Sequence, residues 1–369
     1  MNGRHLEGVA FFVPLRRGHN LRILRRFSMT SEATAEGLQE VHMTAGKTIL
    51  VTGGAGYIGS HMVLALLDAG YQPVILDDFS TGHHRLVPSG VPVIEGNVGD
   101  STVTAKLFAD YDIVAVAHFA ASIVVPESVR DPVKYYLNNT VSTARFIASC
   151  CDAGVRHFIF SSTAAVYGNQ DQNPIAETAP IRPENPYGHS KVMSEQILMD
   201  AAAAHDLTYV ILRYFNVAGA DPKGRSGQLS QPATHLIKIA VETACGQRDG
   251  MQIFGTDYPT QDGTCIRDYI HVSDLIAAHM KALEHLLAGG GSLLANCGYG
   301  HGASVREVVT AVAKIAGKPI RAAEAPRRAG DAAMLVADST RLREGLGWQP
   351  AHDNLSEIIA DALAWERSI

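Results

Sequence analysis

The sequence predicts an α/β fold: a doubly wound parallel sheet with a smaller C-terminal α/β lobe. Short β-branched runs alternate with helix-length segments from Lys47 to about Phe215, which is typical of βαβ units and a parallel sheet. These runs are apolar throughout rather than alternating, as expected for strands that are covered on both faces. A glycine-rich turn follows the first run directly.

Six runs are predicted to form strands of this sheet: residues 48–51, 74–76, 91–94, 113–116, 158–160 and 209–212. Residues 60–69, 133–150 and 187–204 have the length and composition of helices between them. Residues 220–231 are rich in Gly, Pro, Ser and charge and indicate a loop. A strand at 251–254 and helices near 272–287, 305–316 and 355–366 are then expected in the C-terminal lobe.

Composition excludes several classes of protein. The net charge is −6, from 37 acidic and 31 basic residues, which argues against a general nucleic-acid binder. No apolar stretch is long enough to span a bilayer. The five cysteines are scattered and contain no Cys-x-x-Cys pair, so we expect reduced thiols in a cytoplasmic protein. We expect no metal centre.

The first 46 residues differ from the rest. They combine apolar residues with six arginines, five of them between Arg16 and Arg26, and Glu7 is the only acid before Glu32. Such a composition is expected of a targeting peptide. The alternative is a flexible extension, or a start that is non-native or misassigned. Met43 would make a natural start just before the first strand. A secretory signal is not expected, because there is no clear apolar region followed by a small-residue cleavage site.

The glycine-rich turn predicts a dinucleotide site. Gly54-x-Gly56-x-x-Gly59 fits the dinucleotide fingerprint, and Gly53-x-x-Gly56-x-x-Gly59 fits its longer-spaced variant. Glycine permits the tight turn and close approach of the pyrophosphate to the helix N-terminus. Asp77, about 20 residues on, is expected to bind the adenosine ribose and to favour NAD over NADP, with its neighbour Asp78 as the alternative. We therefore assign residues 47–219 to a Rossmann-type NAD-binding domain and 220–369 mainly to an interleaved substrate lobe.

A phenol and an ammonium lie four residues apart at Tyr187 and Lys191. On a helix this spacing places both side chains on one face. A lysine beside a tyrosine favours the phenolate and lowers the tyrosine pKa. The pair therefore predicts a phenolic general base that is usable near neutral pH.

Seven segments together resemble the extended short-chain dehydrogenase/reductase family and, within it, the UDP-glucose 4-epimerases, over about residues 47–366. They are residues 51–61, 118–121, 160–168, 186–191, 212–216, 254–260 and 263–271. The last segment, Gly-Thr-Cys-Ile-Arg-Asp-Tyr-Ile-His, and the segment 254–260 before it are the most diagnostic of the 4-epimerases. The resemblance implies an isomerase of galactose metabolism that interconverts UDP-galactose and UDP-glucose by transient oxidation at sugar C4 with tightly bound NAD.

The resemblance also implies residue roles. Tyr187 would take the proton from the sugar 4-hydroxyl, Lys191 would hold the nicotinamide ribose, and Thr163 would hydrogen-bond the 4-oxygen. The positions implied for NAD are Gly53, Gly56, Tyr57, Ile58, Gly59, Asp77, Asn97, Val98, Phe119, Ala120, Asn138, Tyr187, Lys191 and Phe215. Those implied for the UDP-sugar are Thr163, Asn216, His235, Leu236, Gln252, Ile253, Phe254, Arg267, Ala295, Arg328 and Asp331.

Three positions depart from the family pattern. Asn97 replaces an aspartate that faces the adenine, and Ile123 replaces a lysine that some members place near the cofactor phosphates. Ala295 stands where a bulky tyrosine is expected to close the sugar pocket. A small residue there implies room for an N-acetyl group, and hence activity on UDP-N-acetylglucosamine and UDP-N-acetylgalactosamine.

Other functions compete with this interpretation. The chain could epimerise another UDP-sugar, such as UDP-xylose, UDP-arabinose or UDP-glucuronate, or be a plain dehydrogenase that releases NADH. A non-catalytic NAD-binding regulator is disfavoured, because Tyr187, Lys191 and Thr163 are all present. A 4,6-dehydratase is disfavoured by Ala164 and Ala165, which replace an Asp-Glu pair. The resemblance also suggests a homodimer formed through the helices at 133–150 and 187–204.

Overall fold

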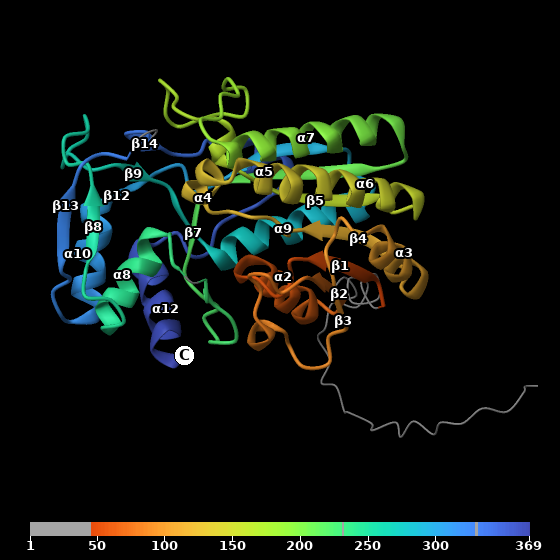
Figure 1. The fold of residues 1–369 in the computed structure, drawn as a ribbon, viewed down its shortest axis with the longest axis horizontal. Coiled ribbons are helices and arrows are strands. Elements are labelled where there is room, and N and C mark those ends of the chain that lie inside the picture. The colour runs from red at the N-terminus through yellow and green to blue at the C-terminus, as the bar shows by residue number, and fades with distance from the viewer. Residues whose placement is uncertain (1–45, 231, 329–330) are drawn as a thin grey trace, which may run out of the picture. The chain divides into compact units, whose positions relative to one another are not determined.

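The computed structural model describes residues 46–230, 232–328 and 331–369, so the predicted extension at 1–46 lies outside the described residues except for Gly46. A seven-stranded parallel sheet with the strand order β11-β6-β5-β4-β1-β2-β3 forms the centre of the described chain (Figure 1). Its strands are β1 (Thr48–Thr52), β2 (Gln72–Asp77), β3 (Val93–Glu95), β4 (Ile113–His118), β5 (His157–Thr163), β6 (Thr208–Tyr214) and β11 (Leu293–Cys297). The predicted doubly wound parallel sheet is confirmed, with all six predicted strands in it.

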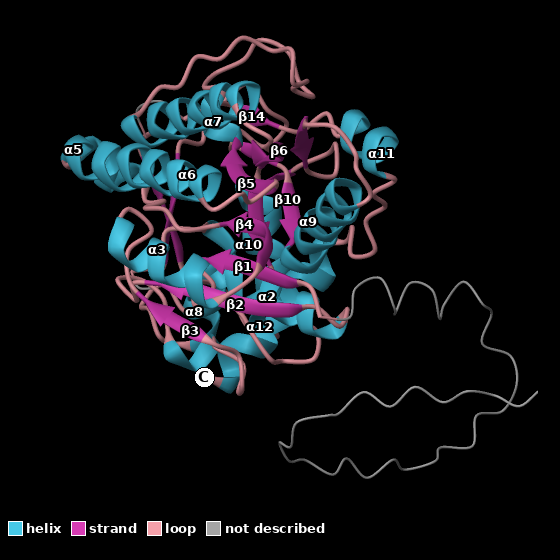
Figure 2. Cartoon of the chain, turned by 90° about the vertical axis from the view of Figure 1, so that its right-hand side faces the viewer, coloured by secondary structure: helices cyan, strands magenta, loops and turns pink. Residues whose placement is uncertain are grey.

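Helices cover both faces of the sheet. Figure 2 shows α3 (Ser101–Asp110), α6 (Ser142–Asp152) and α7 (Pro186–Ala204) on one side, and α2 (Tyr57–Asp68) and α9 (Val272–Leu287) on the other. Alternate residues of β1 pack against the helices on opposite faces of the sheet. Ile49 and Val51 pack with Met62 of α2, whereas Leu50 packs with Phe146 of α6. Burial on both sides explains why the strands are continuous apolar runs.

The predicted helix at 133–150 is not a regular α-helix. The chain forms α4 (Val125–Arg130) and α5 (Pro132–Tyr135), then a π-helical turn η2 (Tyr136–Val141), and continues as α6. Such π-helical turns are frequent at functional sites. This one carries Asn138, a predicted cofactor contact.

The C-terminal part of the chain forms a lobe beside the sheet. Its elements are α8 (Leu236–Cys245), β8 (Met251–Phe254), β9 (Ile266–Arg267), β10 (Tyr269–His271), β12 (Ala303–Ser304), α10 (Val305–Ala316), β13 (Ala322–Ala325), β14 (Met334–Leu335), α11 (Thr340–Leu346) and α12 (Leu355–Ser368). β10 pairs with β7 (Asn216–Ala218), and β8 pairs with β13. β11 comes from beyond residue 219 yet pairs with β6 of the main sheet. The domain boundary that we placed at residue 219 therefore stays a prediction.

The described residues include no helix with the length and apolar character needed to cross a membrane. The five cysteines are free thiols.

Candidate active site

The glycine-rich turn leaves a helix N-terminus open. α2 begins at Tyr57, and its N-cap Gly56 has no side chain to occupy the free N–H groups of the first turn. The turn is too tight for a side chain, because a Cβ on Gly59 would lie 2.1 Å from the carbonyl oxygen of Gly53. Gly53 also has a φ of +69°, which favours glycine. Free N–H groups and a positive dipole end fit the pyrophosphate of NAD.

Asp77 is attached to this turn, whereas Asp78 is not. The buried Asp77 carboxylate accepts hydrogen bonds from the backbone N–H of Ala55 and of Phe79, both at 2.9 Å. Burial raises the Asp77 pKa, and these two donors partly offset that effect. Asp78 is exposed and accepts a bond from the Asn97 amide at 3.0 Å. This placement favours Asp77 as the ribose ligand.

The remaining residues predicted to contact NAD lie near the carboxyl ends of the central strands. Phe119 and Ala120 follow β4, and the backbone of both lies close to Gly53. The Asn138 amide donates to the Ser122 hydroxyl at 3.0 Å. Val98 follows β3 and Phe215 follows β6. The sheet order changes direction between β1 and β4, and nucleotides bind at such a switch point in doubly wound sheets.

Asn139 is a residue that sequence reasoning missed. It is buried, its side-chain oxygen accepts from Ser122 N–H at 2.8 Å, and its amide donates to the Ser190 hydroxyl at 3.1 Å. It thereby ties the loop after β4 to α7. The only signal in the sequence was its position next to Asn138.

Tyr187 and Lys191 lie on one buried face of α7, close to the end of β5. The helix starts at Pro186 after the N-cap Asn185, whose side chain accepts from Gly188 N–H at 2.9 Å. Thr163 is the last residue of β5, and its hydroxyl accepts from Ala165 N–H at 3.1 Å and contacts the Tyr187 phenol. The structure thus brings together the three residues predicted to be catalytic.

The predicted lowering of the Tyr187 pKa is wrong for this structure. Burial raises the Tyr187 pKa to about 12, and the Thr163 contact offsets only part of that effect. Lys191 supplies no offset because it is itself buried, and burial lowers its pKa to about 8 while Glu195 acts in the opposite direction. Desolvation therefore outweighs the charge pairing that the four-residue spacing suggested.

A buried ion pair lies behind Lys191. Glu195, one turn further along α7, accepts from the Arg213 guanidinium at 2.9 and 2.5 Å and also from the Ser162 hydroxyl. The Arg213 and Glu195 side chains are 6% and 2% exposed. The pair joins α7 to β5 and β6 and so fixes the helix that carries Tyr187. Sequence reasoning missed it, because the two residues are 18 positions apart.

A cavity of about 670 Å³ is lined by residues of the C-terminal lobe and by Asn216 of β7. This volume suits a small-molecule ligand. Eight of the predicted substrate residues line it: Asn216, His235, Leu236, Gln252, Phe254, Arg267, Arg328 and Asp331. Residues that sequence reasoning missed also line it: Thr234, Ile239, Arg248, Asp249, Gly250, Met251, Cys265, Tyr269, Val305, Arg321 and Ala323. Tyr269 could have been found from its place in the 263–271 motif.

Cations and aromatic rings pair inside this cavity. The Arg328 guanidinium lies over the Phe254 ring, 3.7 Å from its centroid. Arg267 forms an ion pair with Asp331 at 3.5 Å. Guanidinium groups suit a diphosphate, and an aromatic ring suits a planar base. The cavity therefore has the groups that a nucleoside diphosphate needs.

Three predicted substrate residues do not line the cavity: Thr163, Ile253 and Ala295. Ile253 is 4% exposed and packs in the core, because alternate residues of β8 point to opposite sides. Ala295 is fully buried in the main core and pairs with Leu212 across β11 and β6. The cavity contains none of Thr163, Tyr187 and Lys191 either, so the role of Ala295 at the sugar pocket stays a prediction.

None of the three predicted catalytic residues lines the cavity, but one of its lining residues follows the strand next to Thr163. Asn216, which lines it, follows the end of β6 by two residues. The last residue of β6, Tyr214, is the strand partner of Thr163. The described residues contain no group of three or more His, Cys, Asp or Glu side chains suited to a metal.

Comparisons with known proteins agree with this geometry. Residues 49–298 match the model of the NAD dependent epimerase/dehydratase family. The chain is 56% identical over 325 residues to a UDP-glucose 4-epimerase of Azospirillum brasilense, covering 88% of this chain and 93% of that protein. The crystal structure of UDP-glucose 4-epimerase from Brucella ovis in complex with NAD is 44% identical with a TM-score of 0.84, covering 86% of this chain and 98% of that one.

A Campylobacter jejuni structure described as a UDP-Glc/GlcNAc 4-epimerase is also similar. It is 45% identical with a TM-score of 0.77, and the match covers 88% of this chain and all of that one.

Proposed function

Because this chain belongs to the NAD-dependent epimerase/dehydratase family, we infer that it is an NAD-dependent enzyme that interconverts UDP-galactose and UDP-glucose. The observation that carries this is the cavity of about 670 Å³, in which Asn216, Arg267, Arg328 and Asp331 converge beside the strand end that carries Thr163. The similarity to UDP-glucose 4-epimerases over most of the chain supports the same substrate.

The residues divide the chemistry among them. Tyr187 removes the proton of the sugar 4-hydroxyl, and Thr163 holds the 4-oxygen by a hydrogen bond. Lys191 orients the nicotinamide ribose from the same helix face. NAD, held by the glycine-rich turn, Asp77 and Lys191, would supply the hydride acceptor for C4, and the positive charge of its nicotinamide would favour the ionised form of Tyr187. Arg267 and Arg328 hold the diphosphate while the sugar turns over between the two half-reactions.

Epimerisation is tested by NMR. We expect purified protein, with no added cofactor, to convert UDP-galactose to UDP-glucose, because NAD is regenerated in each cycle. Net accumulation of NADH would instead indicate a dehydrogenase. No conversion even with added NAD would overturn the assignment and favour another UDP-sugar or the regulator.

The range of sugars that the enzyme accepts is measured by the same assay with UDP-xylose, UDP-glucuronate and UDP-N-acetylgalactosamine as substrates. Conversion of UDP-N-acetylgalactosamine would support the prediction that the small side chain of Ala295 leaves room for an N-acetyl group, and no conversion would refute it.

We also propose that the enzyme is a cytoplasmic homodimer. Seven of the eleven strongly exposed large apolar side chains among the described residues lie on the segment from Ile123 to Val141 or on α7: Ile123, Val125, Val129, Val133, Leu137, Val141 and Met193. Five of them, from Val125 to Val141, recur at intervals of four, which makes an apolar stripe along α4, α5 and η2. A contiguous exposed apolar face of this kind favours binding to a protein partner. A second copy of this chain could cover it in a homodimer. The free thiols suit a reducing cytoplasm.

A further inference from the structure

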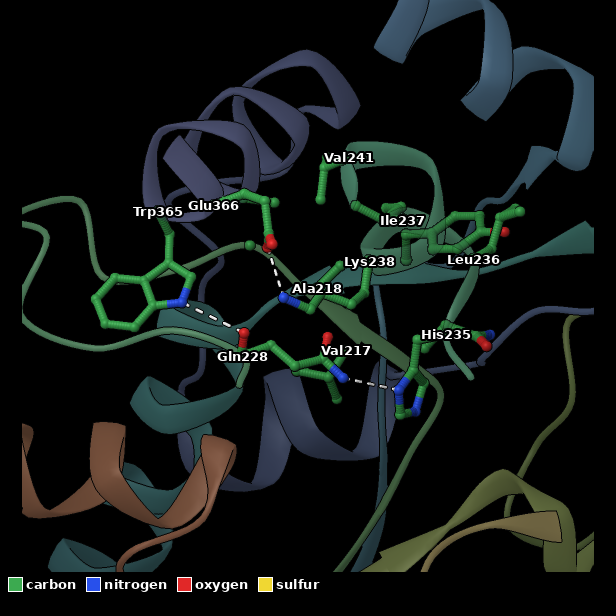
Figure 3. A pocket seen from close by; sticks show the side chains of 14 residues that line it. Val217, Ala218, Gln228, His235, Leu236, Ile237, Lys238, Val241, Trp365 and Glu366 are labelled. Carbon is green, nitrogen blue, oxygen red and sulfur yellow. Dashed lines mark hydrogen bonds and ion pairs between the residues drawn. The ribbon is translucent and has the colours of Figure 1, made fainter. Parts of the chain in front are cut away.

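His235 stands between two hollows of the C-terminal lobe. It is the N-cap of α8, and it lines both the large cavity and a much smaller hollow of about 20 Å³, which has room for about one water molecule. Figure 3 shows the smaller hollow, with Gln228 and His235 facing each other below the Lys238–Glu366 ion pair. His235 therefore has one side toward Gln228 and another toward the nucleotide cavity.

The contact with Gln228 determines which ring nitrogen of His235 carries the proton. The Gln228 side-chain nitrogen lies 3.0 Å from His235 Nδ1. An amide nitrogen can only donate, so Nδ1 must be the acceptor, and the single proton of a neutral imidazole must sit on Nε2. Burial lowers the His235 pKa, which disfavours the doubly protonated ring. The His235 Nε2–H has no partner among the residues that the structure describes.

Gln228 is itself held in place from two sides. Its backbone carbonyl accepts from the Trp365 indole N–H of α12 at 3.3 Å. The preceding Gly227 lets that indole approach, since a Cβ there would lie 2.4 Å from the Trp365 ring. Ser226 binds Ser60 of α2 through its hydroxyl at 2.6 Å. The Gln228 side chain is 7% exposed and so has little freedom to turn away from His235.

We propose that Gln228 is a positioning residue for nucleotide binding: it holds His235 as the Nε2–H tautomer, so that His235 donates one hydrogen bond into the large cavity. This rests on the proposed function, because UDP is the nucleotide that would receive the bond. UDP offers two kinds of acceptor, a uracil carbonyl or a phosphate oxygen. Both accept and neither donates, so a fixed N–H donor suits either.

The tautomer is measured by nitrogen NMR of the histidine side chains in ¹⁵N-labelled protein, with His235→Asn to assign the signal. We expect a non-protonated Nδ1 and a protonated Nε2 for His235. Gln228→Glu replaces the donor by an acceptor, so Nδ1 should become protonated. A protonated Nδ1 in the wild-type protein would overturn the proposal. This readout needs no activity, so it separates failure of the proposal from failure of the assigned reaction.

The consequence for binding is measured by calorimetry. Gln228→Leu should weaken UDP about 2- to 10-fold, the range of one lost hydrogen bond. KM should rise with kcat unchanged, because the bond is made equally in the ground and transition states. Repeating the titration with uridine identifies the acceptor: an equal loss assigns it to the nucleoside, and a loss with UDP only assigns it to a phosphate.

A double-mutant cycle isolates the route through His235. In a His235→Ala background, Gln228→Leu should change UDP affinity by less than twofold, since its target is gone. An equal loss in both backgrounds would show that Gln228 acts on the fold rather than on His235, and would overturn the proposal. If wild-type protein binds no UDP, the assigned reaction fails, while the NMR result still decides the role of Gln228.

Discussion

The Lys191 ammonium of α7 lies over the ring of Phe160 in β5, 4.3 Å from the ring centroid. Both residues are buried, so the aromatic face replaces part of the water that the charge has lost. The replacement is incomplete, because burial still lowers the Lys191 pKa from 10.5 to about 8. Burial therefore makes the charged form of Lys191 costly, although a pKa of about 8 still leaves most of it protonated at pH 7.

Lys191→Met should make the protein more stable near pH 7 while abolishing epimerisation. Between pH 8 and 10.5 the unfolded chain binds the Lys191 proton and the folded chain does not, so wild-type stability rises with pH in that window. The advantage of the variant should be up to about 3 kcal/mol at pH 7 and should shrink toward pH 10.5. Urea unfolding at several pH values measures it, with the exposed Lys314→Met as control. A stability difference between Lys191→Met and wild-type protein that does not change with pH would contradict this prediction.

Tyr187→Phe should lower kcat about 10²- to 10⁴-fold, the usual contribution of a general acid–base group. The phenyl ring keeps its edge contact with Tyr135, where the ring centroids are 6.4 Å apart, so UDP affinity and fold should hold. Epimer formation by NMR and UDP calorimetry measure the two effects. Tyr111→Phe, at the end of α3, should keep full activity. Retention of wild-type turnover by Tyr187→Phe would remove Tyr187 from the mechanism.

Glu195→Gln should destabilise the protein by about 3–5 kcal/mol, because it leaves the Arg213 charge buried without a carboxylate. The Lys191 pKa should fall further, since Glu195 raises it. Denaturant unfolding measures the loss. Asp110→Asn breaks the Lys106–Asp110 pair, whose side chains are 77% and 48% exposed, and should cost less than about 1 kcal/mol. Equal effects for the two variants would show that burial of the pair is unimportant.

Gly59→Ala should prevent retention of NAD, since its methyl group would lie 2.1 Å from the Gly53 carbonyl and the turn must open to admit it. Nucleotide released from denatured protein, separated by chromatography, measures the NAD content. Gly291→Ala is the matched control, because a Cβ there meets nothing within 4 Å. If the Gly59→Ala protein retained as much NAD as wild-type protein, the pyrophosphate would not bind at this turn.

Leu137→Glu should convert the proposed dimer to a monomer. Leu137 is 56% exposed in the apolar stripe, and a charge at the centre of an apolar interface disfavours association. Light scattering after size-exclusion chromatography measures the mass. Leu67→Glu, on α2 and 40% exposed, lies outside the stripe and should leave the mass unchanged. A wild-type monomer at micromolar concentration would refute the dimer.

Local pattern was sufficient for six of the seven strands of the sheet and for the nucleotide turn. Residues 48–60 carry strand, turn and helix signals within one short stretch, and the spacing of Gly53, Gly56 and Gly59 is itself the geometric requirement. The four-residue spacing of Tyr187 and Lys191 likewise predicted their shared helix face, because helical periodicity is a property of the chain itself.

The sequence by itself determined the fold class, the family and eight of the residues that line the cavity. Tertiary structure alone decided that Ala295 faces the core, that β11 joins the sheet, and that burial raises the Tyr187 pKa. It also decided that Arg267 meets Asp331, 64 positions later. The physical reason is that burial and charge pairing depend on segments far apart in the chain, whose approach no local periodicity records.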